Sequence, residues 1–326
     1  MLEEEKSGLA AIFGPPGQEA AAIINSLMQT LELPNIQVHP PMTLWPYNSS
    51  ELMSLNVYPN LYQLWYGIAK IVDSLQWRSY AILYENDESI VKLQHVIKLS
   101  EVKKESVILR KLVAPDYRPV LKEMDNLSYS HIIIDCDVKV VSDILMQAKE
   151  LDMLGYLYSY FVTSLDFHTL DLSHLEGMAN ITSVRITDPE DKRVYNFLKE
   201  CNIGKIIYDS KTSEPNAFIQ TEPSLVWDAT NFFVRTFHEL FLTGEPKVVS
   251  LNCDKKKTGI HSFRLANYMK TRPFPDAITG EIRFEDERRS FLSLQVVEII
   301  KGDMRKLANW NSSYPNEIYL IRTGKQ

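Results

Sequence analysis

The side chains of this sequence that could do chemistry gather in one short segment. His168, Asp171, His174 and Glu176 combine imidazoles with carboxylates, which are ligands that zinc takes in proteins. The two histidines are six residues apart, so they would not share one face of a helix with about 3.6 residues per turn. The segment is therefore predicted to be a solvated loop, and no metal site is expected.

No signature of catalysis or cofactor binding occurs in the chain. Residues 14–20, GPPGQEA, lack the Gly-Lys-Ser/Thr ending of a phosphate-binding loop. The sequence also contains no G-x-G-x-x-G, H-E-x-x-H or G-x-S-x-G motif and no Cys-His signature. We therefore predict no catalytic, cofactor-binding or metal-binding residues, and we do not expect an enzyme.

The same residues could instead open a helix whose free N–H groups hold an anion. Pro15 and Pro16 remove two of those donors, and Glu19 would repel a negative charge. This turn is poorly suited to bind the carboxylate of an amino acid.

Apolar periodicity predicts the elements around this turn. A buried strand is expected over residues 9–13, and a helix from about residue 16 to residue 33. The predicted buried face of that helix follows spacings of four, three and four and consists of Ala20, Ile24, Leu27 and Leu31. Residues 40–59 are predicted to be a long surface loop, followed by a helix over residues 60–76.

The middle of the chain alternates short apolar runs with helical patterns. The predicted strands are residues 80–84, 106–112, 131–135, 157–162 and 181–186. Such alternation predicts an α/β fold with a parallel sheet and right-handed crossovers, and these five strands are expected to complete it.

The residue patterns after residue 187 predict a second sheet. Asp188 and Pro189 are expected to cap a helix that reaches about Cys201, before a loop over residues 203–221. A phenylalanine-rich helix over residues 223–242 needs a further sheet to cover it. A helix after residue 258 and strands over residues 281–284 and 292–300 follow, and the charged run EDERR between the strands is predicted to be an exposed turn.

Composition narrows the class of protein. The chain has 326 residues, enough for two domains, and a net charge of −7, which gives no reason to expect nucleic-acid binding. No apolar run is long enough to span a membrane, and the N-terminus does not resemble a signal peptide. Nevertheless, Asn-x-Ser/Thr sequons, which are candidates for glycosylation, occur at Asn48, Asn126, Asn180 and Asn311.

The three cysteines are an odd number, which in a secreted chain would leave one thiol without a partner. Cys136, Cys201 and Cys253 are too few and too scattered for a disulfide framework or a zinc site. Buried free thiols are favoured for these residues.

A series of segments, in order along nearly the whole chain, resembles the amino-terminal domain of a kainate-type ionotropic glutamate receptor subunit. The segments that carry the resemblance are GLAAIFGP (8–15), LPNIQ (33–37), VYPNL (57–61), ILYEN (82–86), VLKEM (120–124), HIIIDC (131–136), YFVTSLDFHTLDL (160–172), NITSVRI (180–186), SLNC (250–253), ITGEIRF (278–284) and LANW (307–310). No single motif decides the match, but their order and spacing do.

The resemblance implies a two-lobed clamshell of the type I periplasmic-binding-protein class, in which helices flank a parallel sheet in each lobe. Residues 1–76 and 221–279 would form the upper lobe, residues 77–220 and 280–310 the lower lobe, and residues 311–326 the start of a linker. The upper lobe would lack its first two strands, because family members have two strands and two helices before GLAAIFGP. The strand over residues 9–13 would then be exposed at a sheet edge, which favours aggregation.

The resemblance also implies a function. This domain lies outside the cell, assembles with other glutamate receptor subunits at the synapse, and is not the agonist site. It reaches the membrane only through the downstream part of the subunit, and no cofactor or nucleic acid is implied.

The implied subunit contact is the outer side of the first helix, with the candidate residues Gln18, Ala21, Ala22, Asn25, Met28 and Gln29. With part of the usual contact surface missing, we expect weak self-association. The family's disulfide would use Cys253, whose partner cysteine is missing from this chain. A small-molecule receptor domain of the same fold, such as an amino-acid-binding protein, is the alternative.

Overall fold

The computed structural model describes residues 9–41, 53–171, 179–208, 219–244, 260–285, 288–300 and 303–320. The chain forms two compact units. Unit 1 comprises Met1–Tyr62 and Glu222–Leu292, and unit 2 comprises Gln63–Thr221 and Ser293–Gln326, so the chain passes between the units three times. The unit boundaries follow residues 62, 221 and 292, where the predicted lobe boundaries follow residues 76, 220 and 279. The assignment of the units to an upper and a lower lobe stays a prediction.

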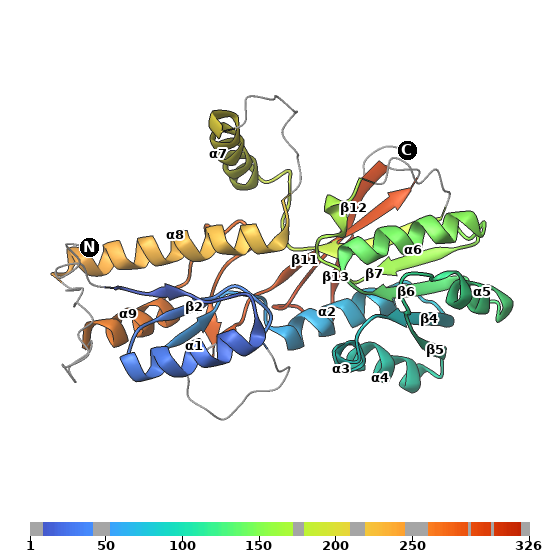
Figure 1. Ribbon diagram of the computed structural model, residues 1–326, viewed down its shortest axis with the longest axis horizontal. Coiled ribbons are helices and arrows are strands. Elements are labelled where there is room, and N and C mark those ends of the chain that lie inside the picture. The colour runs from blue at the N-terminus through green and yellow to red at the C-terminus, as the bar shows by residue number, and fades with distance from the viewer. Residues whose placement is uncertain are drawn as a thin grey trace. The chain divides into compact units, whose positions relative to one another are not determined.

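Unit 1 is built on a five-stranded sheet. Its strand order is β1 (Ile12–Phe13), β2 (Asn35–Gln37), β3 (Ser54–Asn56), β10 (Arg288–Arg289) and β9 (Phe284–Glu285). All neighbouring strands are parallel except β9 and β10. Three helices accompany the sheet, α1 (Gln18–Leu31), α8 (Thr221–Leu242) and α9 (Ile260–Thr271). Figure 1 shows α8 on the opposite side of these strands from α1.

The first strand of unit 1 is shorter than the predicted 9–13 and is not buried, but it lies at a sheet edge among the described residues, as predicted. β1 pairs only with β2, and the side chain of Phe13 is 41% exposed. The amides of Ile12 and Gly14 donate to Pro34 and Ile36 at 2.9 Å each. Residues of a strand alternate in direction, so the backbone groups of Phe13 face away from β2.

One part of unit 1 contradicts the sequence-based expectation of a loop over residues 40–59. Residues 42–52 lie outside the described part, but Ser54–Asn56 forms β3 in the interior of the sheet. Leu55 and Val57 are fully buried there. Because the strand has only three residues and two of them are polar, its periodicity is too short to detect.

The helix α1 forms where predicted but buries a different face. Met28 is 2% exposed, whereas Leu27, expected in the core, is 47% exposed and Ile23 is 69% exposed. The half-buried residues Ala21, Ile24 and Leu31 lie on the same side as Met28. Because apolar residues lie on two sides of this helix, its sequence is compatible with two different buried faces. Packing against β2 and β3 buries the face that contains Met28.

Unit 2 contains an eight-stranded sheet. The five predicted parallel strands are adjacent in it, in the order β5 (Ser106–Lys111), β4 (Ser79–Tyr84), β6 (His131–Asp135), β7 (Ser159–Val162) and β8 (Asn180–Arg185). They do not complete the sheet, however. Three antiparallel strands extend it beyond β8, namely β11 (Ser293–Ile300), β12 (Asp303–Asn311) and β13 (Ile318–Leu320).

Helices cover both faces of the parallel strands of unit 2. They are α2 (Leu61–Ser74), α3 (Glu88–Lys92), α4 (Gln94–Lys103), α5 (Arg118–Asn126) and α6 (Val138–Glu150). Figure 1 shows α6 on one side of the strands and the α3–α4 pair on the other. The core beneath α5 and α6 is apolar throughout, with Ile132, Ile134 and Leu145 fully buried. Strands covered on both faces have this composition, which is why the sequence predicted them.

Three further expectations for unit 2 are corrected. The helix after Asp188 is α7 (Lys192–Tyr208), which starts later than expected, because Asp191 rather than Asp188 accepts the Arg193 amide, at 2.8 Å. Residues 203–208, expected to be a loop, continue α7, while residues 209–218 lie outside the described part. Residues 318–320, assigned to a linker, form β13.

The predicted α/β class, with a mainly parallel sheet flanked by helices in each unit, is confirmed. Among the described residues, no helix has the length and apolar character needed to cross a bilayer.

Candidate functional site

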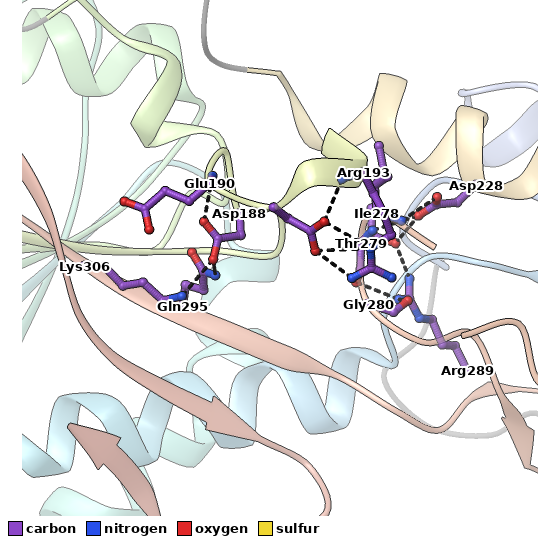
Figure 2. Close-up of polar contacts among 11 residues, drawn as sticks. Asp188, Glu190, Arg193, Asp228, Ile278, Thr279, Gly280, Arg289, Gln295 and Lys306 are labelled. Atoms are coloured by element: carbon purple, nitrogen blue, oxygen red, sulfur yellow. Dashed lines mark hydrogen bonds and ion pairs between the residues drawn. The ribbon is translucent and has the colours of Figure 1, made fainter. Parts of the chain in front are cut away.

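A buried polar cluster in unit 1 contradicts the prediction that EDERR is an exposed turn. Arg289, the last residue of that run, lies on β10 and is 1% exposed, and Asp228 on α8 is equally buried. The hydroxyl of Thr279 joins them, since it donates to Asp228 at 2.6 Å and accepts from Arg289 Nη1 at 3.0 Å. Figure 2 shows Thr279 between the two charged side chains.

Backbone groups complete this cluster. Asp228 also accepts from the amides of Ile278 and Thr279 at 2.8 and 2.9 Å. Arg289 donates to the carbonyl oxygens of Val57 at 3.0 Å, Thr279 at 2.8 Å and Gly280 at 2.7 Å. The cluster therefore binds α8, the end of β3 and β10 to the segment through residues 278–280.

Burial controls the electrostatics of the cluster. Desolvation lowers the pKa of Arg289 to about 10, although the Asp228 carboxylate acts in the opposite direction. Desolvation raises the pKa of Asp228, against the hydrogen bonds from Thr279 and Ile278. Asp228 and Arg289 are opposite buried charges joined through the Thr279 hydroxyl, so removal of either one would leave the other charge without compensation.

A second polar cluster lies in unit 2 around Asp188. The Asp188 carboxylate accepts from Lys306 Nζ at 2.7 Å, from the Glu190 amide at 3.1 Å and from the Gln295 side chain. Arg185 on β8 is buried and donates from Nε to Gln295 Oε1 at 3.0 Å. Burial alone would raise the pKa of Asp188, but the hydrogen bonds from Lys306 and Gln295 outweigh it and the pKa is lowered. Figure 2 shows Lys306 and Gln295 directed at this carboxylate.

In both clusters the carboxylates are well satisfied, whereas Arg289 Nε in the unit 1 cluster is buried without a hydrogen-bond partner among the described residues. Each carboxylate is held by several donors from the protein, as buried charges generally are. Within the described ranges, no group of three or more His, Cys, Asp or Glu side chains is placed to hold a metal ion.

The expected solvated histidine segment is not solvated at His168. This residue lies in the short 3-10 helix η2 (Phe167–Thr169) and is 2% exposed. Its Nε2 lies 3.1 Å from the carbonyl oxygen of Ile219. Burial, with a smaller contribution from Arg185, lowers its pKa. His174 and Glu176 lie outside the described residues, and Asp171 is exposed.

The start of α1 has the composition that disfavours an anion. The helix begins at Gln18, Gly17 precedes it, and no side chain caps its first turn. Glu19 in that turn is exposed and adds a negative charge. A side chain at Gly17 would meet no neighbouring atom within 4 Å, so this end of the helix is open.

The candidate contact residues on α1 separate into two groups. Ala22 and Gln29 are exposed, and Ala21 is half-buried. Met28 is buried, and the Asn25 side chain accepts from Asn35 and, at 2.8 Å, from Gln37, so it faces the sheet. The side chain of Gln18 lies outside the described part. The face of α1 that is open for contact therefore runs through Glu19, Ala22, Ile23, Ser26, Leu27 and Thr30.

The sequons and cysteines also occupy different environments. Asn126 is exposed at the end of α5, Asn311 is half-buried at the end of β12, and Asn180 is half-buried at the start of β8. Asn48, Cys253 and the side chain of Cys201 lie outside the described residues. Cys136 is a partly buried free thiol whose pKa burial raises.

Comparison with protein families gives one match over most of the chain. The model of the "Receptor family ligand binding region" matches residues 1–302. The chain belongs to this receptor ligand-binding family. The resemblance to kainate-type glutamate receptors found in the sequence is confirmed by similarity to curated proteins.

Two relatives of this receptor ligand-binding chain carry the same name in different organisms. "Glutamate receptor ionotropic, kainate 1" of Mus musculus is 26% identical over 316 residues, which are 94% of this chain and 37% of the relative. The Homo sapiens protein of that name is 25% identical over 322 residues, 96% of this chain and 34% of the relative. The chain thus spans about a third of the length of these relatives.

The buried cluster of unit 1 was missed by sequence reasoning, yet one signal was present. Asp228 lies three residues after Leu225 and four before Phe232, both of which are buried, so it interrupts the apolar face of α8. An acidic residue on an apolar face requires a buried partner. No local pattern identifies Arg289 as that partner.

Proposed function

We propose that this chain is an extracellular domain of a kainate-type glutamate-gated cation channel subunit, where it acts in subunit assembly and in modulation of excitatory synaptic signalling. The observation that carries the proposal is similarity to kainate 1 receptors over 94–96% of the chain. The agonist site of the receptor would lie outside the domain. The receptor ligand-binding family is a binding class and not an enzyme class, which agrees with the absence of catalytic motifs in the sequence.

The proposal includes partners and location. The partners are other glutamate receptor subunits, in homomeric or heteromeric tetramers, on the outer side of the plasma membrane at synapses. Contact with the membrane would come through the rest of the subunit. The family's disulfide would use Cys253, and it cannot form within this sequence, because no cysteine precedes Cys136.

Within the domain, we assign unit 1 to the upper lobe and unit 2 to the lower lobe, and we assign subunit contact to α1. Support for the contact comes from exposed apolar side chains on the helix surface, since Ile23 is 69% and Leu27 is 47% exposed. Apolar side chains at such exposure gain free energy when a partner covers them. This face keeps Ala22 from the predicted set and leaves out the buried Met28 and Asn25, whose side chain faces the sheet.

The test measures association with a receptor subunit. The full chain, fused to a cleavable secretory leader, is produced together with the corresponding region of kainate 1, and the complex is quantified by sedimentation of the purified proteins. We expect a heteromeric complex stronger than the self-association of the chain. Absence of any complex with kainate, AMPA-type and other glutamate receptor subunits would overturn the proposal.

An amino-acid-binding receptor domain is the second candidate, because the family is named for ligand binding. The open, uncapped start of α1 with its exposed Glu19 disfavours a carboxylate there. Calorimetric titration with glutamate and a panel of amino acids separates the candidates. Saturable heat with any of them would favour the second.

A further inference from the structure

An arginine side chain covers one edge of the sheet in unit 2. Among the described residues, β5 is the last strand on its side of that sheet and pairs only with β4. We infer that Arg110 closes this edge to strand addition, and that without its side chain two copies of the protein would join by antiparallel pairing of β5 with β5. The inference concerns a surface that is kept out of association, and it does not rest on the proposed function.

Alternate backbone groups of β5 face away from the sheet. The Ser106 amide donates to the Arg78 carbonyl at 3.0 Å, and the Leu112 amide donates to the Tyr84 carbonyl at 2.7 Å. Alternate residues of a strand face the same neighbour. The residues whose backbone groups face outward are therefore Val107, Leu109 and Lys111. Such a row of unpaired N–H and C=O groups is a template for another strand.

The composition and symmetry of β5 would favour such pairing. Its middle, Val107–Leu109, is apolar and half-buried, and valine and isoleucine are enriched in strands. In an antiparallel pair centred on Leu109, Val107 of each copy would lie opposite Lys111 of the other. A two-fold axis would thus use every outward-facing residue on both copies, so the edge is complementary to itself.

Arg110 occupies the place of an incoming strand at the centre of this edge. Its Nη1 donates to the Leu109 carbonyl at 3.0 Å, a distance at which the amide of a second strand would bind. Leu109 is the middle residue of the outward-facing row. A paired strand lies about 4.7–4.9 Å away, so it could not approach while the guanidinium is in this position.

The helix α5 holds the arginine in place. Nε and Nη2 of Arg110 lie 2.8 and 2.7 Å from Glu123 Oε1, and Glu123 belongs to α5. The planar guanidinium can therefore bind the carboxylate and the Leu109 carbonyl at the same time. The two charged side chains are 39% and 41% exposed, and ion pairs at such exposure add little to stability. Removal of the arginine should therefore leave the fold of unit 2 intact.

Other polar contacts hold the two ends of the edge. The hydroxyls of Ser106 and Tyr129 are 2.9 Å apart, and Lys111 Nζ donates to Asp87 at 2.7 Å. Both end positions of β5 are exposed, and a lysine at an edge discourages strand pairing. These contacts join side chains, whereas Arg110 binds the backbone itself. Arg110 is thus placed to protect the apolar middle of the strand.

The experiment compares two arginine variants of the full 326-residue chain. Arg110→Leu removes the covering side chain and keeps a residue that a strand accommodates. Arg118→Leu is the matched control, because Arg118 has a similar exposure of 41% and forms ion pairs with Asp116 and Glu150, but lies on α5. Both variants carry Ile23→Asp, so that association through α1 does not contribute.

Sedimentation over a concentration series measures the dissociation constant of the dimer, and amide hydrogen exchange locates the contact. We expect Arg110→Leu to lower this constant by about tenfold or more, and Arg118→Leu to leave it unchanged. In the dimer of Arg110→Leu, exchange should slow at the amides of Val107, Leu109 and Lys111. Exchange at the buried Ile133 of β6 reports whether unit 2 stays folded.

Two results would overturn the inference. One is equal self-association of Arg110→Leu and Arg118→Leu, and the other is a dimer of Arg110→Leu whose outward-facing β5 amides exchange as fast as in the parent chain. If Arg110→Leu is unfolded, Arg110→Lys provides the same test, because lysine keeps the charge but lacks the planar set of donors. Arg110→Lys should also lower the dissociation constant, and an unchanged constant would refute the role of Arg110.

Discussion

Replacing Thr279 by valine removes a single hydroxyl from the buried cluster of unit 1 and keeps the shape of the side chain. The hydroxyl makes two hydrogen bonds to charged groups, at 2.6 Å to Asp228 and at 3.0 Å to Arg289. Such bonds contribute about 1.5–3 kcal/mol each, so we expect the free energy of unfolding of unit 1 to fall by about 3–6 kcal/mol.

A matched control lies on α8. Thr236 is also buried, but its hydroxyl donates only to the Phe232 carbonyl of the same helix, at 2.7 Å. Thr236→Val removes one bond between neutral groups, for which we expect a loss of about 0.5–1.5 kcal/mol. The difference between the two variants isolates the contribution of the charge-bridging hydroxyl.

The assay has to report on unit 1 alone, because two units can unfold separately. Amide hydrogen exchange in increasing urea provides this, since the Ile278 and Thr279 amides donate to Asp228. Thr279→Val should accelerate their exchange well beyond Thr236→Val. If both variants lose the same free energy to within about 1 kcal/mol, the idea that the Thr279 hydroxyl bridges Asp228 and Arg289 is wrong.

Three further predictions concern packing, pH and contact. Gly67→Ala should destabilise unit 2 by about 1–3 kcal/mol in urea titrations, because the added Cβ would lie 2.6 Å from the Trp310 side chain. Gly155→Ala is the control and should be nearly neutral, because its Cβ would have no neighbour closer than 3.9 Å. Burial lowers the pKa of His168 in the folded chain, so near pH 6.5 only the unfolded chain takes up the proton. The free energy of unfolding of unit 2 should therefore fall as pH drops below about 6.5, by up to about 1.4 kcal/mol per pH unit. His168→Gln should reduce that slope in urea titrations between pH 7 and pH 5, and an unchanged slope would contradict the assignment. Ile23→Asp should weaken association with a receptor subunit about tenfold, a change of about 1.4 kcal/mol, with an unchanged melting temperature; equal binding in sedimentation would exclude this face of α1.

The parallel strands of unit 2 could be predicted because burial on both faces leaves an apolar run without alternation. His131–Asp135 forms β6 with the predicted bounds for this reason. The strand β12, DMRKLANWN, mixes charged and apolar residues and gives no such run. Its place in the sheet follows from pairing with β11, a contact that no local pattern encodes.

The polar clusters could not be predicted because their partners are distant in sequence. Asp228 and Thr279 are 51 residues apart, and Arg289 and Val57 are 232 residues apart. Charge alone made Arg289 look exposed, and only the tertiary fold supplies the acceptors that allow its burial. In α1, by contrast, the helix was predictable and its orientation was not, since both of its sides carry apolar residues.

The pairing of β3 with β10 also constrains how the chain can fold during synthesis. Asn56 of β3 pairs with Arg288 of β10. The ribosome adds Arg288 roughly 10–50 s after Asn56 at typical rates of translation, so β3 lacks this partner during that time. Over the same interval all five parallel strands of unit 2 are completed, because Gln63–Thr221 lies between the two parts of unit 1. The uninterrupted segment can therefore acquire its structure first, while the sheet of unit 1 keeps an unpaired strand that a chaperone or a neighbouring nascent chain could bind.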